Sequence, residues 1–135
     1  LGILDEYHTS NDTSMMEVLD SSQTQQDQPL IMIISTAGFK LNAPMYTIEY
    51  PYVTKILNGE EENDNYFAIV YEQDSEEEIN DESLWIKSNP LLESDEVRET
   101  MLKNLRKKLK EARAKDEMHK TLVKNFNMWQ SASKE

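Results

Sequence analysis

Cysteine is absent from this chain of 135 residues. The absence excludes disulfide bonds and thiolate metal sites, and it argues against a small secreted scaffold held by disulfides. No stretch approaches the run of about 20 apolar residues that a transmembrane helix requires. A leader with a charged, an apolar and a small-residue region is also missing, so we expect a soluble intracellular protein that does not bind membranes.

Glycine is scarce, and none of the three glycines belongs to a Gly-x-x-x-x-Gly-Lys-Ser/Thr loop, which cradles nucleotide phosphates. The chain also lacks an initiator methionine and starts inside an apolar run. We therefore expect a truncated chain or a piece of a longer protein. The loss of neighbouring strands would expose an apolar sheet edge and favour self-association.

The formal net charge is −12, but the charges are segregated along the chain. Eleven acidic residues and no basic residue lie between Glu60 and Glu82, whereas ten of the fourteen lysines and arginines lie between Arg98 and Lys124. A basic helix of this kind either follows a phosphate backbone or forms a solvated face. The candidate DNA contacts are Arg106, Lys107, Lys108 and Lys110.

The first six residues are an apolar run, residues 1–4, followed by the adjacent acids Asp5 and Glu6. An apolar run without alternation is typical of a strand buried on both faces of a parallel sheet, and ligands bind at the carboxyl ends of such strands. In a Walker B strand, the first acid helps to hold Mg²⁺ and the second activates the attacking water. These positions make Asp5 the metal candidate and Glu6 the catalytic candidate. Alternatively, both carboxylates only cap the following turn.

A second apolar run, residues 30–34, leads directly into Ser35, Thr36, Ala37 and Gly38. A short helix with a capping box at Ser14 fits between the two runs, so a right-handed crossover would make the strands parallel. Hydroxyls and backbone N–H groups at that edge can bind a γ-phosphate, and a glycine allows close approach. The alternative is an ordinary exit from a strand into a loop.

The rest of the chain predicts one more strand and several helices. We expect a helix over residues 42–57 that breaks near Pro51, a third strand over residues 66–72, and a packing role for Trp85. A long helix capped by Ser94 and a second amphipathic segment follow. The predicted fold is α/β, with a parallel sheet of about three strands, flanking helices and a C-terminal helical segment. Its parts are residues 1–93 (α/β), 94–129 (helical) and 130–135 (tail).

Together these motifs resemble the large terminase subunit of tailed bacteriophages, the ATP-driven motor that packages DNA into preformed capsids. The resemblance rests on residues 3–8, on residues 28–30 leading into 34–38, on residues 85–90 and on residues 126–129. Their order and spacing are similar to the second half of the family's ATPase domain. The resemblance covers nearly the whole chain.

This resemblance implies a partial P-loop NTPase-type sheet in which Asp5 and Glu6 are the Walker B acids, with ATP and Mg²⁺ as cofactors of the parent protein. It makes Ser35, Thr36 and Ala37, with Gly38 after them, the motif that couples the γ-phosphate to movement on DNA. The implied partners are double-stranded DNA, the portal protein, the small terminase subunit and further copies of the chain, in the host cytoplasm. The family's nuclease would begin where this chain stops. Without the phosphate loop, the isolated segment should be inactive.

Two other interpretations remain at this point. Residues 5–8, Asp-Glu-Tyr-His, also fit the Asp-Glu-x-His box of helicase-like ATPases, although those proteins usually carry Ser-Ala-Thr where this chain has Ser35-Thr36-Ala37. A non-catalytic acidic interaction module, whose basic helices bind an acidic partner, would require both strand-end motifs to be coincidental.

Overall fold

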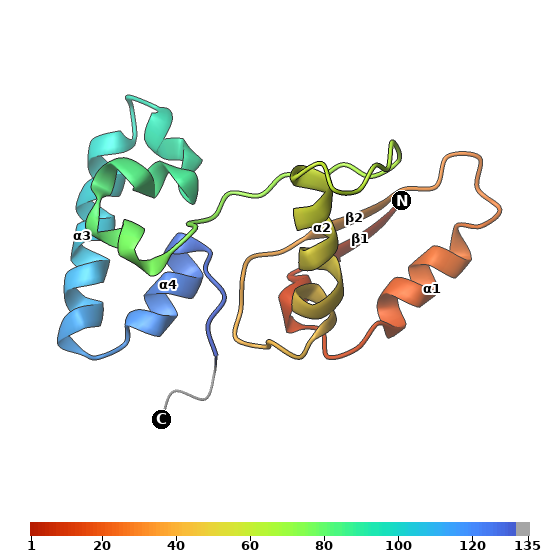
Figure 1. The fold of residues 1–135 in the computed structure, drawn as a ribbon, viewed down its shortest axis with the longest axis horizontal. Coiled ribbons are helices and arrows are strands. Elements are labelled where there is room, and N and C mark those ends of the chain that lie inside the picture. Colours follow the sequence, from red (N-terminus) through yellow and green to blue (C-terminus); the bar gives the residue numbers. More distant parts are fainter. Residues whose placement is uncertain (132–135) are drawn as a thin grey trace. The chain divides into compact units, whose positions relative to one another are not determined.

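The computed structural model describes residues 1–131, which divide into two compact units (Figure 1). Of the described residues, 1–36 and 40–68 form the sheet unit, and 37–39 and 69–131 form the helical unit. The sequence placed its main division at residue 93 instead. The difference arises because residues 69–93 share a core with the later helices.

The sheet unit contains two parallel strands, β1 (Gly2–Asp5) and β2 (Ile31–Ile34), joined through the short helix η1 (Tyr7–Thr9) and the helix α1 (Ser14–Ser22). Asp5 is in register with Ile34, so both strands end at the same edge. The predicted α/β class and the parallel crossover are confirmed. The sheet has two strands where about three were expected.

Within the sheet unit, the two faces of the sheet differ in burial. Leu4 is buried, whereas Ile3, Met32 and Ile34, on the opposite face, are between 43% and 53% exposed. The expectation that the first strand is buried on both faces is therefore wrong for this chain. Gly2 lies on the covered face, where an added Cβ would come within 3.0 Å of the Leu19 side chain, so glycine allows α1 to approach β1 closely.

The expected helix over residues 42–57 is present but irregular. It consists of a π-helical segment, η2 (Met45–Glu49), followed by α2 (Tyr50–Leu57), and it ends near Gly59, which adopts a φ of 74°. Pro51 occupies the first turn of α2. Because proline cannot donate a backbone hydrogen bond, the irregular turn lies where a break was predicted.

The predicted third strand is wrong. Residues 66–72 form neither a helix nor a strand, and they pair with no strand in the described part of the chain. Phe67, Ile69 and Tyr71 are 86%, 59% and 48% exposed, whereas the residues between them are partly buried. This alternation is typical of a strand, but nothing covers its apolar side in the described residues. The composition of this segment is typical of a strand, but the segment connects the two units instead of joining the sheet.

The helical unit contains three short 3₁₀ helices, η3 (Glu76–Asn80), η4 (Glu82–Lys87) and η5 (Pro90–Glu93), and two α-helices, α3 (Arg98–Ala114) and α4 (Met118–Phe126). Its core is formed by Ile79, Trp85, Leu92, Leu105, Leu109, Leu122 and Phe126. The Trp85 ring meets Phe126 edge to face at 5.7 Å and donates Nε1–H to the Ile79 carbonyl at 3.0 Å. The predicted packing role of Trp85 is confirmed.

Two predicted helix caps lie elsewhere. The predicted cap, Ser14, is itself the first residue of α1, and its backbone N–H donates to the Asp12 carboxylate at 3.0 Å. Ser94 precedes α3 by one turn, and its carbonyl, not its hydroxyl, accepts from Val97 and Arg98. Both helices start close to the predicted position, so the signal for their onset is correct although the capping atoms differ.

The last segment of the described chain is held in place. Gln130, assigned to the tail from the sequence, is buried, and its backbone N–H donates to the Gly38 carbonyl at 3.3 Å. Residues 132–135, the rest of that predicted tail, lie outside the described residues. Within residues 1–131, the helices are all too short or too polar to cross a lipid bilayer.

Candidate functional site

The candidate site lies where β1 and β2 end together. Asp5 is the last residue of β1, Glu6 follows it, and Ser35 follows β2 directly. Because the strands are parallel and in register, the acids and the hydroxyl leave the same edge of the sheet. Both acidic side chains are exposed, that of Glu6 by 58%. The arrangement therefore presents two carboxylates to a ligand at the edge where α/β sheets bind one.

Glu6 has an unusual backbone conformation. Its φ of 53° lies in the left-handed region, which costs a non-glycine residue about 1–2 kcal/mol. The conformation is stabilised by the next turn, since the N–H and the hydroxyl of Thr9 donate to the Glu6 carbonyl at 3.0 and 2.8 Å. Strained residues of this kind concentrate at functional sites.

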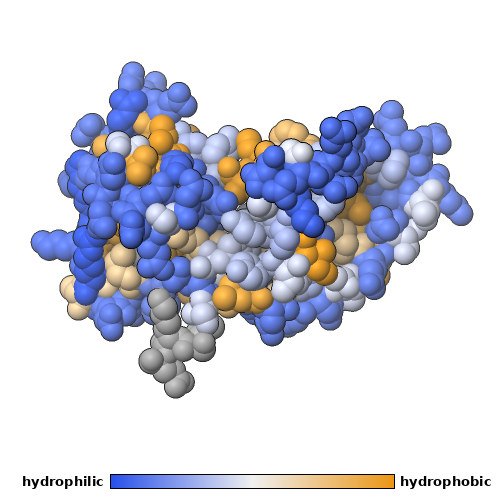
Figure 2. Space-filling view, in the orientation of Figure 1, coloured by the Kyte–Doolittle hydropathy of each residue, from blue (hydrophilic) through white to orange (hydrophobic). Residues whose placement is uncertain are grey.

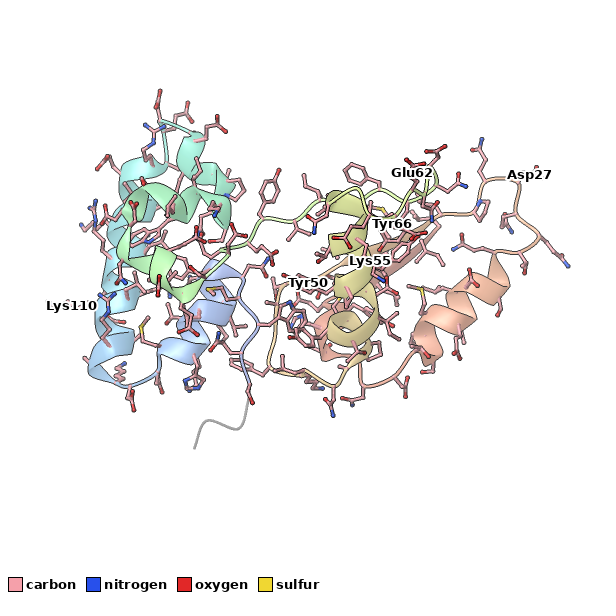
Figure 3. All side chains as sticks on the ribbon, in the orientation of Figure 1. Asp27, Tyr50, Lys55, Glu62, Tyr66 and Lys110 are labelled. Atoms are coloured by element: carbon pink, nitrogen blue, oxygen red, sulfur yellow. The ribbon has the colours of Figure 1, made fainter. Side chains whose placement is uncertain are left out.

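Tyr7 anchors the loop that follows the acids. Its side chain is 2% exposed, and burial raises its pKa, with a further contribution from the charge of Glu49. Burial also raises the pKa of Glu49, and the Tyr66 hydroxyl lies 3.4 Å from its carboxylate. Burial next to Glu49 raises the pKa of Tyr66 to about 12, so this hydroxyl stays protonated at neutral pH. Figure 3 shows Tyr66 beside α2.

His8 links the two strand ends and was given no role from the sequence. Its backbone N–H donates to Ser35 Oγ at 3.0 Å, its Nδ1 lies 3.2 Å from the same oxygen, and its Nε2 is 3.7 Å from Glu6. The Ser35 hydroxyl in turn donates to the Thr36 carbonyl at 2.8 Å. The position of His8 two residues after the acid pair was the available signal. Its contact with Ser35 required the parallel register.

Lys40 is a second residue that sequence analysis missed. Its ammonium donates to the Thr9 carbonyl at 2.8 Å and to the Asn11 side chain at 2.9 Å, so it holds the loop after the acid pair. Nothing in its sequence context pointed to this role, because the contact joins positions 31 residues apart.

The four residues after β2 are shared between the units. Ser35 and Thr36 belong to the sheet unit, whereas Ala37 and Gly38 belong to the helical unit. Ala37 is 3% exposed, and its N–H donates to the Asn127 side chain at 2.6 Å. The Asn127 amide donates to the Tyr71 carbonyl at 2.9 Å. The predicted coupling motif therefore spans the boundary between the units, and Asn127 fixes its second half.

The candidate DNA contacts all lie on α3, in different surroundings. Arg106 forms a two-bond ion pair with Glu82, and this contact lowers the pKa of the Glu82 carboxyl. Lys107 lies 3.9 Å from Glu111. Lys110 points away from the body of the helical unit (Figure 3), and Lys108 lines a groove between α3 and α4. Of these four cations, Lys108 alone is among the residues that line this groove, and the role of all four in DNA binding stays a prediction.

Acidic residues do not form a multidentate metal cage in the described residues. No group of three or more His, Asp or Glu side chains is placed to hold a metal ion within residues 1–131. Asp5 and Glu6 supply two adjacent carboxylates, which suits Mg²⁺ held mainly by water and substrate phosphates.

Comparison with known proteins adds the family. The sequence model described as "Terminase large subunit, endonuclease domain" matches residues 60–135, which is more than half of the chain. The chain belongs to the terminase large subunit family. Sequence analysis placed the nuclease of this terminase after residue 135, and the match corrects this, because the model that residues 60–135 fit is that of the endonuclease domain.

The terminase chain is also 30% identical over 130 residues to Protein YmfN of Escherichia coli (strain K12). That alignment covers 96% of this chain but only 28% of Protein YmfN, so the chain spans less than a third of its curated relative. No solved structure matches the present chain significantly. The terminase family match favours the packaging interpretation over the helicase-like enzyme and the interaction module.

Proposed function

We propose that this chain is a segment of a phage terminase large subunit in which the sheet unit forms one side of the ATP site that drives DNA packaging. The observation that carries this proposal is the shared edge at which Asp5, Glu6 and Ser35 leave two parallel strands in register. Membership in the terminase large subunit family supports the packaging role.

In this proposal Asp5 and Glu6 have separate tasks. Asp5, at the end of β1, would help to hold Mg²⁺, and Glu6 would orient the attacking water and accept its proton while the bond between the γ-phosphate and the departing ADP breaks. Bound Mg²⁺ and ATP supply the charge neutralisation and the phosphoryl group. The 58% exposure of the Glu6 side chain supports this assignment, because it leaves the carboxylate accessible to a ligand at this edge. The phosphate loop comes from another part of the protein, so this chain alone binds ATP poorly.

Ser35, Thr36, Ala37 and Gly38 act in this proposal as the coupling motif. Ser35 contacts His8 near the acids, while Ala37 is fixed to Asn127 in the helical unit. A change at the phosphate end of such a segment is transmitted along the chain from one unit to the other. Replacement of Thr36 by alanine should therefore impair DNA translocation more than ATP binding.

The remaining parts of the proposal follow from the family. The partners are double-stranded DNA, the portal protein and the small terminase subunit, and the protein acts in the host cytoplasm. The exposed apolar face at Ile3, Met32 and Ile34 supports contact with further protein, either other parts of the subunit or a second copy.

An endonuclease activity of the same protein is a second candidate function, favoured by the description of the matching family model. Residues 1–131 contain no group of three acids or histidines that could hold a metal ion. Cleavage of plasmid DNA by this chain with Mg²⁺ or Mn²⁺ measures whether residues 60–135 carry that activity.

ATP turnover by a longer terminase large subunit that contains both this chain and a phosphate loop tests the proposed function. We expect Glu6→Gln to lower turnover by roughly 10²–10⁴-fold while ATP binding is retained. Glu60→Gln, an exposed acid in a loop, is the matched control. Unchanged turnover in Glu6→Gln would remove Glu6 as the base.

A further inference from the structure

An open groove lies between α3 and α4 in the helical unit and encloses about 160 Å³. Its lining is rich in lysine. Buried Ala112 forms part of the lining from α3, and the charged lining residues are Lys108, Glu111, Lys115, Glu117, Lys120 and Lys124. Four lysines therefore face two glutamates in a chain whose formal net charge is −12.

Helical spacing brings these lysines together. Lys108 and Lys115 are seven residues apart, which places them two turns apart on one face of α3 and its C-terminal end. Lys120 and Lys124 are four residues apart on α4, one turn from each other on one face. Because α3 and α4 pack against each other, both faces line the same groove, and all four lysines are exposed.

Most of this positive charge is not neutralised within the protein. Glu117 lies 3.2 Å from Lys120, and Glu111 lies 3.9 Å from Lys107, which is outside the groove. Lys108, Lys115 and Lys124 form no ion pair within residues 1–131. By contrast, Arg106 on the same helix is already paired with Glu82.

We propose that this groove, through Lys108, Lys115 and Lys124, binds the phosphate backbone of double-stranded DNA without reading its sequence. Thr121 and Asn125, which also line the groove, supply neutral donors for phosphate oxygens. The lining contains no aromatic residue on which an unpaired base could stack, and this favours duplex DNA over a single strand. The choice of DNA rests on the proposed packaging function, and the groove adds a contact surface separate from the nucleotide site.

The location of the groove also changes the set of candidate DNA contacts. Of the four cations predicted from the sequence, only Lys108 lines it. The sequence alone did not indicate Lys115 and Lys124 as DNA contacts. Their place in the groove depends on how α3 and α4 pack against each other. Lys55, Lys103 and Arg113 are exposed, lie outside the lining and are not candidate DNA contacts, so they form a control set of equal charge.

Fluorescence anisotropy of the 135-residue chain with a labelled duplex of mixed sequence tests the proposal. The groove triple variant, K108Q/K115Q/K124Q, should weaken binding at least about tenfold and reduce the slope of log K against log salt by about 2–3, because each lost phosphate contact removes about one unit. The control triple, K55Q/K103Q/R113Q, should change affinity less than about threefold and leave the slope unchanged. The charge-preserving triple, K108R/K115R/K124R, should retain both.

Equal weakening by the groove and control triples would overturn the proposal, because binding would then depend on overall charge. No binding by the unmodified chain, or an unchanged affinity of the groove triple, would also overturn it. Equal or tighter binding of single-stranded DNA or of poly-glutamate would exclude the duplex as the ligand. Circular dichroism of each variant excludes unfolding as the cause. The assay contains no nucleotide, so it is independent of whether Glu6 acts in ATP hydrolysis.

Discussion

The Asn127 side chain accepts a hydrogen bond of 2.6 Å from the backbone N–H of Ala37, which lies 90 residues away in sequence. Asn127 itself has a φ of 52°, directly after α4, and its amide also donates to the Tyr71 carbonyl. One side chain thus joins three segments of the helical unit: the residues after β2, the segment around Tyr71 and the end of α4. The left-handed turn that ends α4 places this side chain.

Substitution of Asn127 should destabilise the helical unit. Asn127→Ala removes both hydrogen bonds, and we expect it to lower the free energy of unfolding by about 1–3 kcal/mol. Asn127→Gly removes the same bonds but tolerates the left-handed backbone, so it should be about 1 kcal/mol less destabilising than alanine. Denaturation followed by tryptophan fluorescence measures this, because both tryptophans lie in the helical unit. An equally stable Asn127→Ala variant would contradict the role of this side chain.

Ser35→Ala should loosen the loop after the acid pair. It removes the acceptor of the His8 backbone N–H, a loss of about 1 kcal/mol, which corresponds to roughly fivefold faster hydrogen exchange at His8. Ser21→Ala, at an exposed position of α1, is the control and should leave exchange at His8 unchanged. Unaltered exchange in Ser35→Ala would show that the contact between the strand ends is not stabilising.

Much of the site could be predicted from its local pattern. The two apolar runs ending in acids and hydroxyls correctly indicated parallel strands with a common edge, because an intervening helix leaves few other ways to connect them. The link between His8 and Ser35 and that between Ala37 and Asn127 could not be predicted. Each depends on a pairing between residues distant in sequence, and neither residue type signals its partner.

The predicted third strand failed for a related reason. Residues 66–72 have the composition of a strand, but strand formation also requires a neighbouring edge, and the sheet of this chain provides none for them. Helix onsets were predicted well because they depend on residues within one turn. The groove between α3 and α4 required knowledge of which helix faces meet.

Trp85→Phe should weaken the core of the helical unit. The change removes the donor to the buried Ile79 carbonyl and part of the ring that packs on Phe126. We expect a loss of about 1–3 kcal/mol in unfolding free energy, measured by helical circular dichroism during chemical denaturation. Tyr71→Phe, which alters a side chain that is 48% exposed, should change stability by less than about 0.5 kcal/mol. Equal effects of the two changes would argue against an anchoring role for Trp85.

Stability should depend on pH through Glu78. The hydrogen bond from Lys87, together with backbone N–H groups of Asp74 and Ser75, lowers the pKa of the Glu78 carboxyl from its usual 4.5. Because the folded-state pKa is lowered, the stabilisation is present above pH 4.5 and is lost as the pH falls through the folded-state pKa.

Melting curves of the wild-type chain and of Glu78→Gln between neutral and acidic pH test this dependence. The stability advantage of the wild type should be constant near neutrality and should shrink below pH 4.5. Glu77→Gln, at an exposed neighbouring position, is the control and should parallel the wild type. If the wild type kept its stability advantage over Glu78→Gln at low pH, the ionised Glu78 carboxylate would not be the source of that advantage.

The most direct test of the central claim is a crystal structure of a longer terminase large subunit that contains both this chain and a phosphate loop, bound to Mg²⁺ and a non-hydrolysable ATP analogue. The account predicts that Asp5 lies in the hydration shell of the Mg²⁺ and that Glu6 lies within hydrogen-bond reach of a water in line with the γ-phosphate, next to the end of β2. A nucleotide bound away from this sheet edge, with Asp5 and Glu6 in contact with neither metal nor attacking water, would contradict it.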